Sequence, residues 1–282
     1  MKSSIVAVSL LGAIFILALP VPAQTTLKTG LQTLPGDAPA IRDKAPFLQY
    51  DFDLSRETFF VAVPKNYSGK EPFGLLVFMS PSDIFNRVPT GWGPVLEKRK
   101  LIFVAPQNVG NNQQTARRAG MAVVCAHKLP RLANIDTNRI YVAGLSGGAR
   151  IASWASFAHP RLFSGVCSIC GVNFCRKVPR VQATETDEYG YFSIDTPRIR
   201  ETKRRVRFAL VTGSKDFRHG NILDIYIGGF LPDGFQAKLL DIDGMPHALC
   251  PAPVLDEALG FIESRPEEPI NGKDAAPLVS SR

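Results

Sequence analysis

Short apolar runs alternate with helix-forming segments along most of the chain. Uninterrupted apolar runs of four to seven residues are typical of strands that are covered on both faces of a sheet. Because helical segments separate them, the pattern predicts an α/β fold with a mostly parallel central sheet and helices on both faces. The expected strands are 74–79, 101–105, 140–143, 163–169, 206–211 and 236–241, and the expected helices are 94–100, 113–132, 147–158, 222–230 and 254–262.

The ends of the chain do not follow this alternation. Residues 1–23 combine an early lysine, an apolar run and small residues before Gln24, which is the layout of a secretory signal peptide, with an uncleaved anchor as the alternative. Residues 24–47 are rich in Pro, Gly and Thr and predict an irregular lead-in, and 265–282 predict a disordered tail. The folded domain is therefore expected over 48–264.

Two further segments of that domain depart from the alternation of buried strands and helices. Residues 49–54 and 58–63 are strand-like and predict a hairpin at its start. Residues 171–205 show no clear periodicity and are too long for an ordinary connection in a compact domain. Because long connections usually have a function, we expect 171–205 to form a small irregular, cap-like insertion over the functional site.

The charge pattern and the motif content argue against nucleic-acid binding. The net charge of +8 is modest for 282 residues, and its densest basic cluster, at 198–207, is partly offset by Asp195 and Glu201. Nucleic-acid binding would call for interleaved aromatic residues or a known reader motif, and the sequence has neither. The favoured interpretation is a solvated basic face, with an acidic substrate or an anionic surface as the alternative.

The most informative stretch is the strand, tight turn and helix around Gly144-Leu-Ser-Gly-Gly148. A GxSxG pentapeptide between a strand and a helix is the signature of a nucleophile elbow. Glycines on both sides of Ser146 bring no Cβ into the crowded turn. The helix N-terminus directs its N–H groups at the oxygen that becomes negative during acyl transfer. Ser146 is therefore predicted as the nucleophile and the Gly147 N–H as an oxyanion donor.

A serine nucleophile needs a histidine base, which in turn is oriented by a carboxylate. Of the four histidines, His127 lies within an expected helix, and His159 ends the helix after Ser146, too far from it. His247 lies in a Gly/Pro loop after the last strand, at the sheet edge that carries the elbow. His247 is the predicted base, with His219, just beyond a strand end, as its rival.

The predicted acid is Asp216, which follows a strand and a glycine turn in Val211-Thr-Gly-Ser-Lys-Asp216. Asp195 and Asp243 remain as alternatives. The order Ser146, Asp216, His247 is the Ser…Asp…His order of α/β-hydrolases.

The region from about 73 to 262 resembles an α/β-hydrolase of the secreted esterase type, similar to polyhydroxybutyrate depolymerase-like and feruloyl or acetylxylan esterase-like proteins. The matching motifs are Gly-Leu-Ser-Gly-Gly, the His159-Pro160 helix end, the Gly213-x-x-Asp216 turn and the late His247. The resemblance implies an α/β-hydrolase fold and a secreted serine hydrolase that cleaves carboxylic esters through an acyl-enzyme, without a metal or cofactor. A peptidase of the same fold and a catalytically degenerate exported binding protein are the alternatives.

One departure from those families concerns the oxyanion hole. They usually place His-Gly after the third core strand, where this chain has Met79-Ser80-Pro81. Pro81 has no N–H to donate. The second donor is therefore expected from the backbone of Ser80, or of Ser82. Loss of one donor costs about 10²–10³ in rate, which keeps the degenerate alternative open.

Aromatic residues in the loops predict the substrate contacts. Phe85 and Trp92 follow the third core strand and Tyr191 lies in the cap-like insertion, so these three are the candidate substrate-binding residues, although they equally suit packing of the cap against the body. The expected partner is a small-molecule or polymeric ester. We expect no nucleic acid, no stable membrane insertion after signal cleavage, and a secreted or periplasmic location.

Five cysteines in an exported chain predict two disulfides and one remaining thiol. Cys167 and Cys170 lie three apart in an expected strand, so their side chains point to opposite faces and do not pair with each other. A Cys175–Cys250 or Cys170–Cys250 bridge would tie the His247 loop to the base of the cap. A zinc site is not predicted, because a second ligand pair is missing.

Overall fold

The computed structural model describes residues 27–36, 53–182 and 190–264, and all structural statements concern these residues. Eight strands form one sheet in the order β1-β2-β4-β3-β5-β6-β7-β8. β2 is antiparallel to both of its neighbours, and the strands from β4 to β8 are parallel. The strands are β1 (Gly30–Pro35), β2 (Thr58–Val63), β3 (Phe73–Met79), β4 (Leu101–Pro106), β5 (Ile135–Leu145), β6 (Gly165–Ile169), β7 (Arg207–Lys215) and β8 (Gln236–Pro246).

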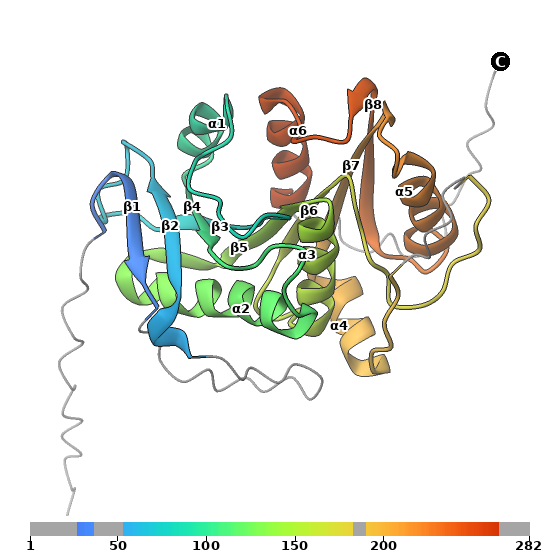
Figure 1. The fold of residues 1–282 in the computed structure, drawn as a ribbon, viewed down its shortest axis with the longest axis horizontal. Coiled ribbons are helices and arrows are strands. Elements are labelled where there is room, and N and C mark those ends of the chain that lie inside the picture. The colour runs from blue at the N-terminus through green and yellow to red at the C-terminus, as the bar shows by residue number, and fades with distance from the viewer. Residues whose placement is uncertain (1–26, 37–52, 183–189, 265–282) are drawn as a thin grey trace, which may run out of the picture.

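Helices cover both faces of this sheet, as the apolar pattern predicts (Figure 1). One face carries α1 and α6, and the other carries α2, α3 and α4. The helices are α1 (Trp92–Lys98), α2 (Thr115–Leu132), α3 (Gly147–Ala158), α4 (Thr196–Arg205), α5 (His219–Ile225) and α6 (Ala252–Glu263), with a short 3-10 turn at Leu54–Arg56 and a π-helical turn at Tyr226–Phe230. Among the described residues, no helix has both the length and the apolar character needed to cross a membrane.

Strand β3 shows why the core strands are continuous apolar runs. Leu75 and Val77 pack into the core on the α2 and α3 side, whereas Leu76 and Phe78 pack into the core on the α1 and α6 side. All seven residues of β3 are buried. Because each such side chain contributes about 1.5–3 kcal/mol by burial, a polar residue on either face would be costly.

The expected irregular lead-in is wrong for part of its length. Gly30–Pro35 forms β1 and pairs antiparallel with β2, so the sheet begins before residue 48. β2 pairs with β1 and β4 instead of forming a hairpin with 49–54, of which 49–52 lie outside the described residues. β1 is an edge strand whose side chains are exposed or only half-buried, so its backbone pairing leaves little hydrophobic pattern in the sequence. The proposed signal peptide and tail lie outside the described residues.

The cap-like segment also needs correction, because its last ten residues form helix α4. The Asp195 carboxylate caps this helix by accepting a hydrogen bond from the Arg198 N–H at 2.8 Å. α4 packs on α3 and serves as the crossover helix between β6 and β7. Only 171–195 remains as a candidate cap, and 183–189 lie outside the described residues.

The strand that leads to Ser146 is longer than expected. β5 spans Ile135–Leu145, whereas the expected strand covered only 140–143. Phe73 pairs with Ile135, whereas Leu75 pairs with Ile140, so the polar residues between them lie in a register shift. This irregularity explains why a polar stretch belongs to a strand.

Candidate active site

Ser146 lies at the sharp turn between β5 and α3. Its backbone angles are φ 55° and ψ −122°, a conformation that costs energy for a residue with a side chain. The Ser146 N–H donates to the Ile169 carbonyl at 2.8 Å, and the Ser146 carbonyl accepts from the Arg150 N–H at 3.1 Å. The turn is therefore anchored to β6 on one side and to the first turn of α3 on the other.

Space around this turn explains its two outer glycines. A Cβ on Gly144 would lie 2.4 Å from the carbonyl carbon of Gly148, and a Cβ on Gly148 would lie 2.0 Å from the carbonyl oxygen of Met79. Both distances are far below van der Waals contact and involve backbone atoms that cannot move aside. The spacing of the pentapeptide follows from these contacts.

Asp216 and His247 form a hydrogen-bonded pair at the same edge of the sheet. The His247 Nδ1 lies 2.7 Å from the Asp216 Oδ1, which also accepts the Arg218 N–H at 2.9 Å. The Thr212 hydroxyl donates to the Asp216 Oδ2 at 2.8 Å. The Asp216 side chain is fully buried and that of His247 is 20% exposed. This arrangement fixes the imidazole through Nδ1 and leaves Nε2 for proton transfer.

The protonation state of Asp216 suits this role. Burial raises the pKa of its carboxyl group, but hydrogen bonds from His247, the Arg218 N–H, Thr212 and Cys170 outweigh burial and hold the pKa below its ordinary value. Asp216 is therefore a carboxylate at neutral pH and can hold a proton on His247 Nδ1.

The rival residues are engaged elsewhere. The His219 Nε2 lies 3.0 Å from both carboxylate oxygens of Asp241. The Asp243 carboxylate accepts from the Ser214 hydroxyl at 2.9 Å, and Asp195 caps α4.

His247 is further oriented by Phe217. The centroids of the two rings are 4.1 Å apart, and the interplanar angle is 31°.

No hydrogen bond joins Ser146 to His247, both of which are described in this structure. Their common neighbour is Cys170, which lines the cavity next to Ser146 and whose Sγ lies within 4.8 Å of ligand atoms of both Asp216 and His247. Serine–histidine hydrogen bonds are often long in ligand-free enzymes and shorten in the substrate complex. Ser146, Asp216 and His247 therefore lie close together, but Ser146 and His247 are not hydrogen-bonded in this structure.

The cysteine prediction is wrong, because all five cysteines are free and buried. Cys170 follows β6 with φ 53° instead of lying within the strand, and its Sγ is 3.4 Å from the Ala248 carbonyl oxygen. A thiol hydrogen bond thus joins it to the His247 loop where a disulfide was expected. Cys170, Asp216 and His247 are also positioned to share a metal ion. Burial, followed by the Asp216 charge, raises the pKa of the Cys170 thiol well above its ordinary value, which favours a thiol donor over a metal-binding thiolate.

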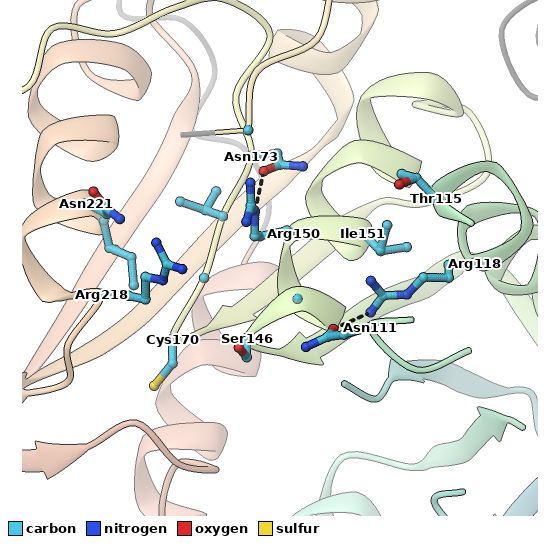
Figure 2. A pocket seen from close by; sticks show the side chains of 15 residues that line it. Asn111, Thr115, Arg118, Ser146, Arg150, Ile151, Cys170, Asn173, Arg218 and Asn221 are labelled. Carbon is cyan, nitrogen blue, oxygen red and sulfur yellow. Dashed lines mark hydrogen bonds between the residues drawn. The ribbon is translucent and has the colours of Figure 1, made fainter. Parts of the chain in front are cut away.

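A cavity of about 400 Å³ opens beside Ser146 and Gly147 (Figure 2). It lies between the start of α3, the segment after β6 and the loop after β7. Its lining is polar and includes the side chains of Asn111, Thr115, Arg118, Arg150, Asn173, Arg218 and Asn221.

Asn111 is a residue that the sequence analysis missed. A Cβ built on Gly147 would lie 2.1 Å from the Asn111 Oδ1, so this amide lies directly against the backbone that follows Ser146. The Oδ1 accepts from the Arg118 Nη2 at 3.1 Å, which turns the Nδ2 away from Arg118 and toward Ser146 (Figure 2). The Asn111 N–H donates to the Pro81 carbonyl at 2.8 Å, which fixes the loop. No sequence motif marks this position.

Ser80 is fully buried and does not line the cavity. Its hydroxyl accepts from the Ser82 N–H at 2.9 Å, and its carbonyl oxygen lies 3.4 Å from the Arg118 Nη2. Gly147 lines the cavity and the Ser80 side chain does not. The role of the Ser80 backbone N–H as an oxyanion donor stays a prediction.

The three predicted aromatic contacts do not line the cavity either. Trp92 is fully buried, packs edge-on against Phe78 and donates to the Cys250 carbonyl at 3.0 Å. Phe85 packs on Phe78, with ring centroids 4.7 Å apart. Tyr191 is 53% exposed and pairs through its backbone with Phe174. Trp92 is a core residue, which corrects its predicted role, and Phe85 is partly buried and packs against the core away from the cavity.

Comparison with known proteins identifies the fold. No family profile and no curated protein matches the sequence. A ferulic acid esterase is similar at 16% identity and a TM-score of 0.55, and the match covers 83% of this chain and 94% of that one. An esterase from Pyrobaculum calidifontis is similar at 14% identity and a TM-score of 0.54, over 86% of this chain and 87% of that one. A putative dipeptidyl aminopeptidase IV from Bacteroides ovatus is similar at 13% identity and a TM-score of 0.52, over 83% of this chain and 35% of that one. The chain spans only about a third of that peptidase and 58% of a thermostable esterase. At these identities the likeness establishes the α/β-hydrolase fold, in agreement with the strand order.

Proposed function

We propose that this chain is a serine hydrolase that cleaves carboxylic esters through an acyl-enzyme. The observation that carries the proposal is the buried, hydrogen-bonded pair of Asp216 and His247 at the sheet edge that holds the strained Ser146 turn. The esterases among the structural neighbours support the reaction class. A peptidase of the same fold is the second candidate, which the Bacteroides ovatus neighbour favours.

The proposed reaction uses each member of the triad once in each half. The Ser146 Oγ attacks the ester carbonyl while His247 Nε2 takes its proton, and Asp216 stabilises the imidazolium through Nδ1. When the tetrahedral intermediate collapses, the same proton passes to the leaving alcohol. A water molecule then attacks the acyl-enzyme by the same route in reverse, which releases the acid and returns the proton to Ser146.

Two donors support the oxyanion in this proposal. The Gly147 N–H lies at the N-terminus of the twelve-residue helix α3, whose dipole favours negative charge there. The second donor is the Asn111 Nδ2, which Arg118 orients through the Oδ1. An amide side chain thus takes the part that a backbone N–H after β3 plays where no proline intervenes.

The location and substrate of the protein are proposed from the sequence. Residues 1–23 lie outside the described residues, and we propose that they direct export and are then removed. The product is then a secreted or periplasmic enzyme that acts on a small-molecule or polymeric ester. N-terminal sequencing of the exported protein should begin at Gln24.

The proposal is tested by hydrolysis of 4-nitrophenyl butyrate and of the matched anilide by the purified mature chain. We expect ester hydrolysis that falls by about 10⁴-fold or more in Ser146→Ala and His247→Ala. His219→Ala is the matched control, because His219 is a histidine beside a carboxylate at the same edge of the sheet. Its variant should keep the wild-type rate. Loss of activity in His219→Ala but not in His247→Ala would contradict the assignment, and cleavage of the anilide alone would favour the peptidase.

A further inference from the structure

The cavity beside Ser146 is lined by cations. Arg118 comes from α2, Arg150 from α3 and Arg218 from the loop between β7 and α5. No aspartate or glutamate occurs among the described residues that line it. Three guanidinium groups from three separate elements therefore converge on one cavity of about 400 Å³, a volume typical of small-molecule sites.

Arg150 is closely coupled to the nucleophile. It lies one helical turn after Ser146, and its N–H donates to the Ser146 carbonyl at 3.1 Å. Its Nε donates to the Asn173 Oδ1 at 2.8 Å, which fixes the plane of the guanidinium. Figure 2 shows Arg150 and Arg218 on two sides of the space above Ser146. A substrate that reaches Ser146 and fills this cavity therefore lies against a lining that includes both arginines.

The placement of these cations has an electrostatic cost. Burial, followed by the nearby charge of Arg150, lowers the pKa of Arg118 to about 10, and Asp83 offsets only part of this effect. Like charges gathered in a partly buried cavity repel each other more strongly than they do in water. A carboxylate bound in the cavity would be attracted by the positive charges of the arginines, and the side-chain amides of Asn173 and Asn221 line the same space.

We propose that this arginine-lined cavity binds a carboxylate of the substrate, so that the preferred substrates are esters that carry a second, anionic carboxylate a few bonds from the reacting carbonyl. Guanidinium groups match the planar carboxylate by paired hydrogen bonds, which gives this site both charge and orientation. This inference rests on the proposed ester hydrolysis at Ser146. It adds a substrate class to that proposal.

The test compares two nitrophenyl esters of nearly equal size. Mono-4-nitrophenyl adipate carries a free carboxylate, and 4-nitrophenyl methyl adipate is its neutral counterpart. We expect kcat/KM to be at least about tenfold higher for the anionic ester, because hydrogen bonds to charged groups are about twice as strong as neutral ones. The preference should decrease with added salt. Equal rates on both esters would overturn the inference and leave the proposed hydrolase intact, whereas hydrolysis of neither would overturn the proposed function.

Variants locate the preference within the cavity. In Arg150→Gln we expect the preference to fall to about threefold or less, mainly through a higher KM for the anionic ester. Arg161→Gln is the matched control, because Arg161 is exposed and pairs with Glu201 outside the cavity. It should keep the full preference. If the preference for the anionic ester is unchanged in both Arg150→Gln and Arg218→Gln, it arises from another part of the surface, and the inference is overturned.

The chain itself contains carboxylates close in sequence to the cavity. Glu185, Asp187 and Glu188 precede the cavity residue Gly190 and lie outside the described residues. The triple variant E185Q/D187N/E188Q should show the same preference as the wild type. A preference that appears only in this triple variant would mean that the chain supplies its own anion, which would overturn the inference for the native protein.

Discussion

Replacing Asn111 with alanine removes the side-chain amide that lies against the backbone of Gly147. If its Nδ2 stabilises the oxyanion, the variant loses one of two donors, which costs about 10²–10³ in kcat, or about 2.7–4 kcal/mol of transition-state stabilisation. The same change costs folding little. Asn111 is exposed, and the only side-chain hydrogen bond shown for it, to Arg118, contributes about 1 kcal/mol.

The assay is the steady-state hydrolysis of 4-nitrophenyl butyrate, with thermal unfolding measured in parallel. Because the oxyanion exists only along the reaction path, kcat should fall while KM changes little. Asn112→Ala is the matched control, since Asn112 is the exposed next residue and does not line the cavity. A rate for Asn111→Ala within threefold of the wild type would refute this assignment and return the second donor to the backbone after β3.

Three further predictions concern the acid, the elbow and the cysteines. Asp216→Asn should lower kcat by about 10⁴. The pKa of Asp216 in the folded protein is below its ordinary value of about 3.9. The wild type should therefore gain stability over Asp216→Asn above that pH, and this gain should disappear as the pH falls through the folded-state pKa. Urea unfolding of both proteins at several pH values measures the difference. Gly148→Ala places a Cβ 2.0 Å from the Met79 carbonyl oxygen and should lower the free energy of unfolding by about 2–3 kcal/mol or more. Gly93→Ala is the control, because Gly93 has open space around it in α1, and it should be neutral or stabilising. Equal melting temperatures for the two variants would contradict the account of the elbow. Since all five cysteines are thiols, a reductant should leave the melting temperature unchanged, and a decrease would show a disulfide.

The sequence predicted the features that burial and local sterics determine. Strands such as β3 are buried on both faces, so their apolar runs are visible without any structure. The elbow is determined by backbone contacts at Gly144 and Gly148, and the pairing of Asp216 with His247 follows from the shared edge of parallel strands.

The features that depend on contacts between distant segments could not be predicted. β1 is an exposed edge strand that is held by backbone pairing to β2. α4 has a polar sequence, so its helical structure becomes evident only from its packing on α3. Trp92 looked like a loop aromatic, but it fills the core beneath α6. Asn111 becomes informative only when Gly147 and Arg118 are seen beside it.

The central claim is that Ser146 is a nucleophile activated by His247. Mass spectrometry of the folded protein after reaction with a fluorophosphonate tests it most directly. We predict a single adduct on the peptide that contains Ser146, no adduct in Ser146→Ala, and labelling slowed by roughly 10²-fold or more in His247→Ala. Folded protein that stays unlabelled, or an adduct on a different residue, would contradict the claim.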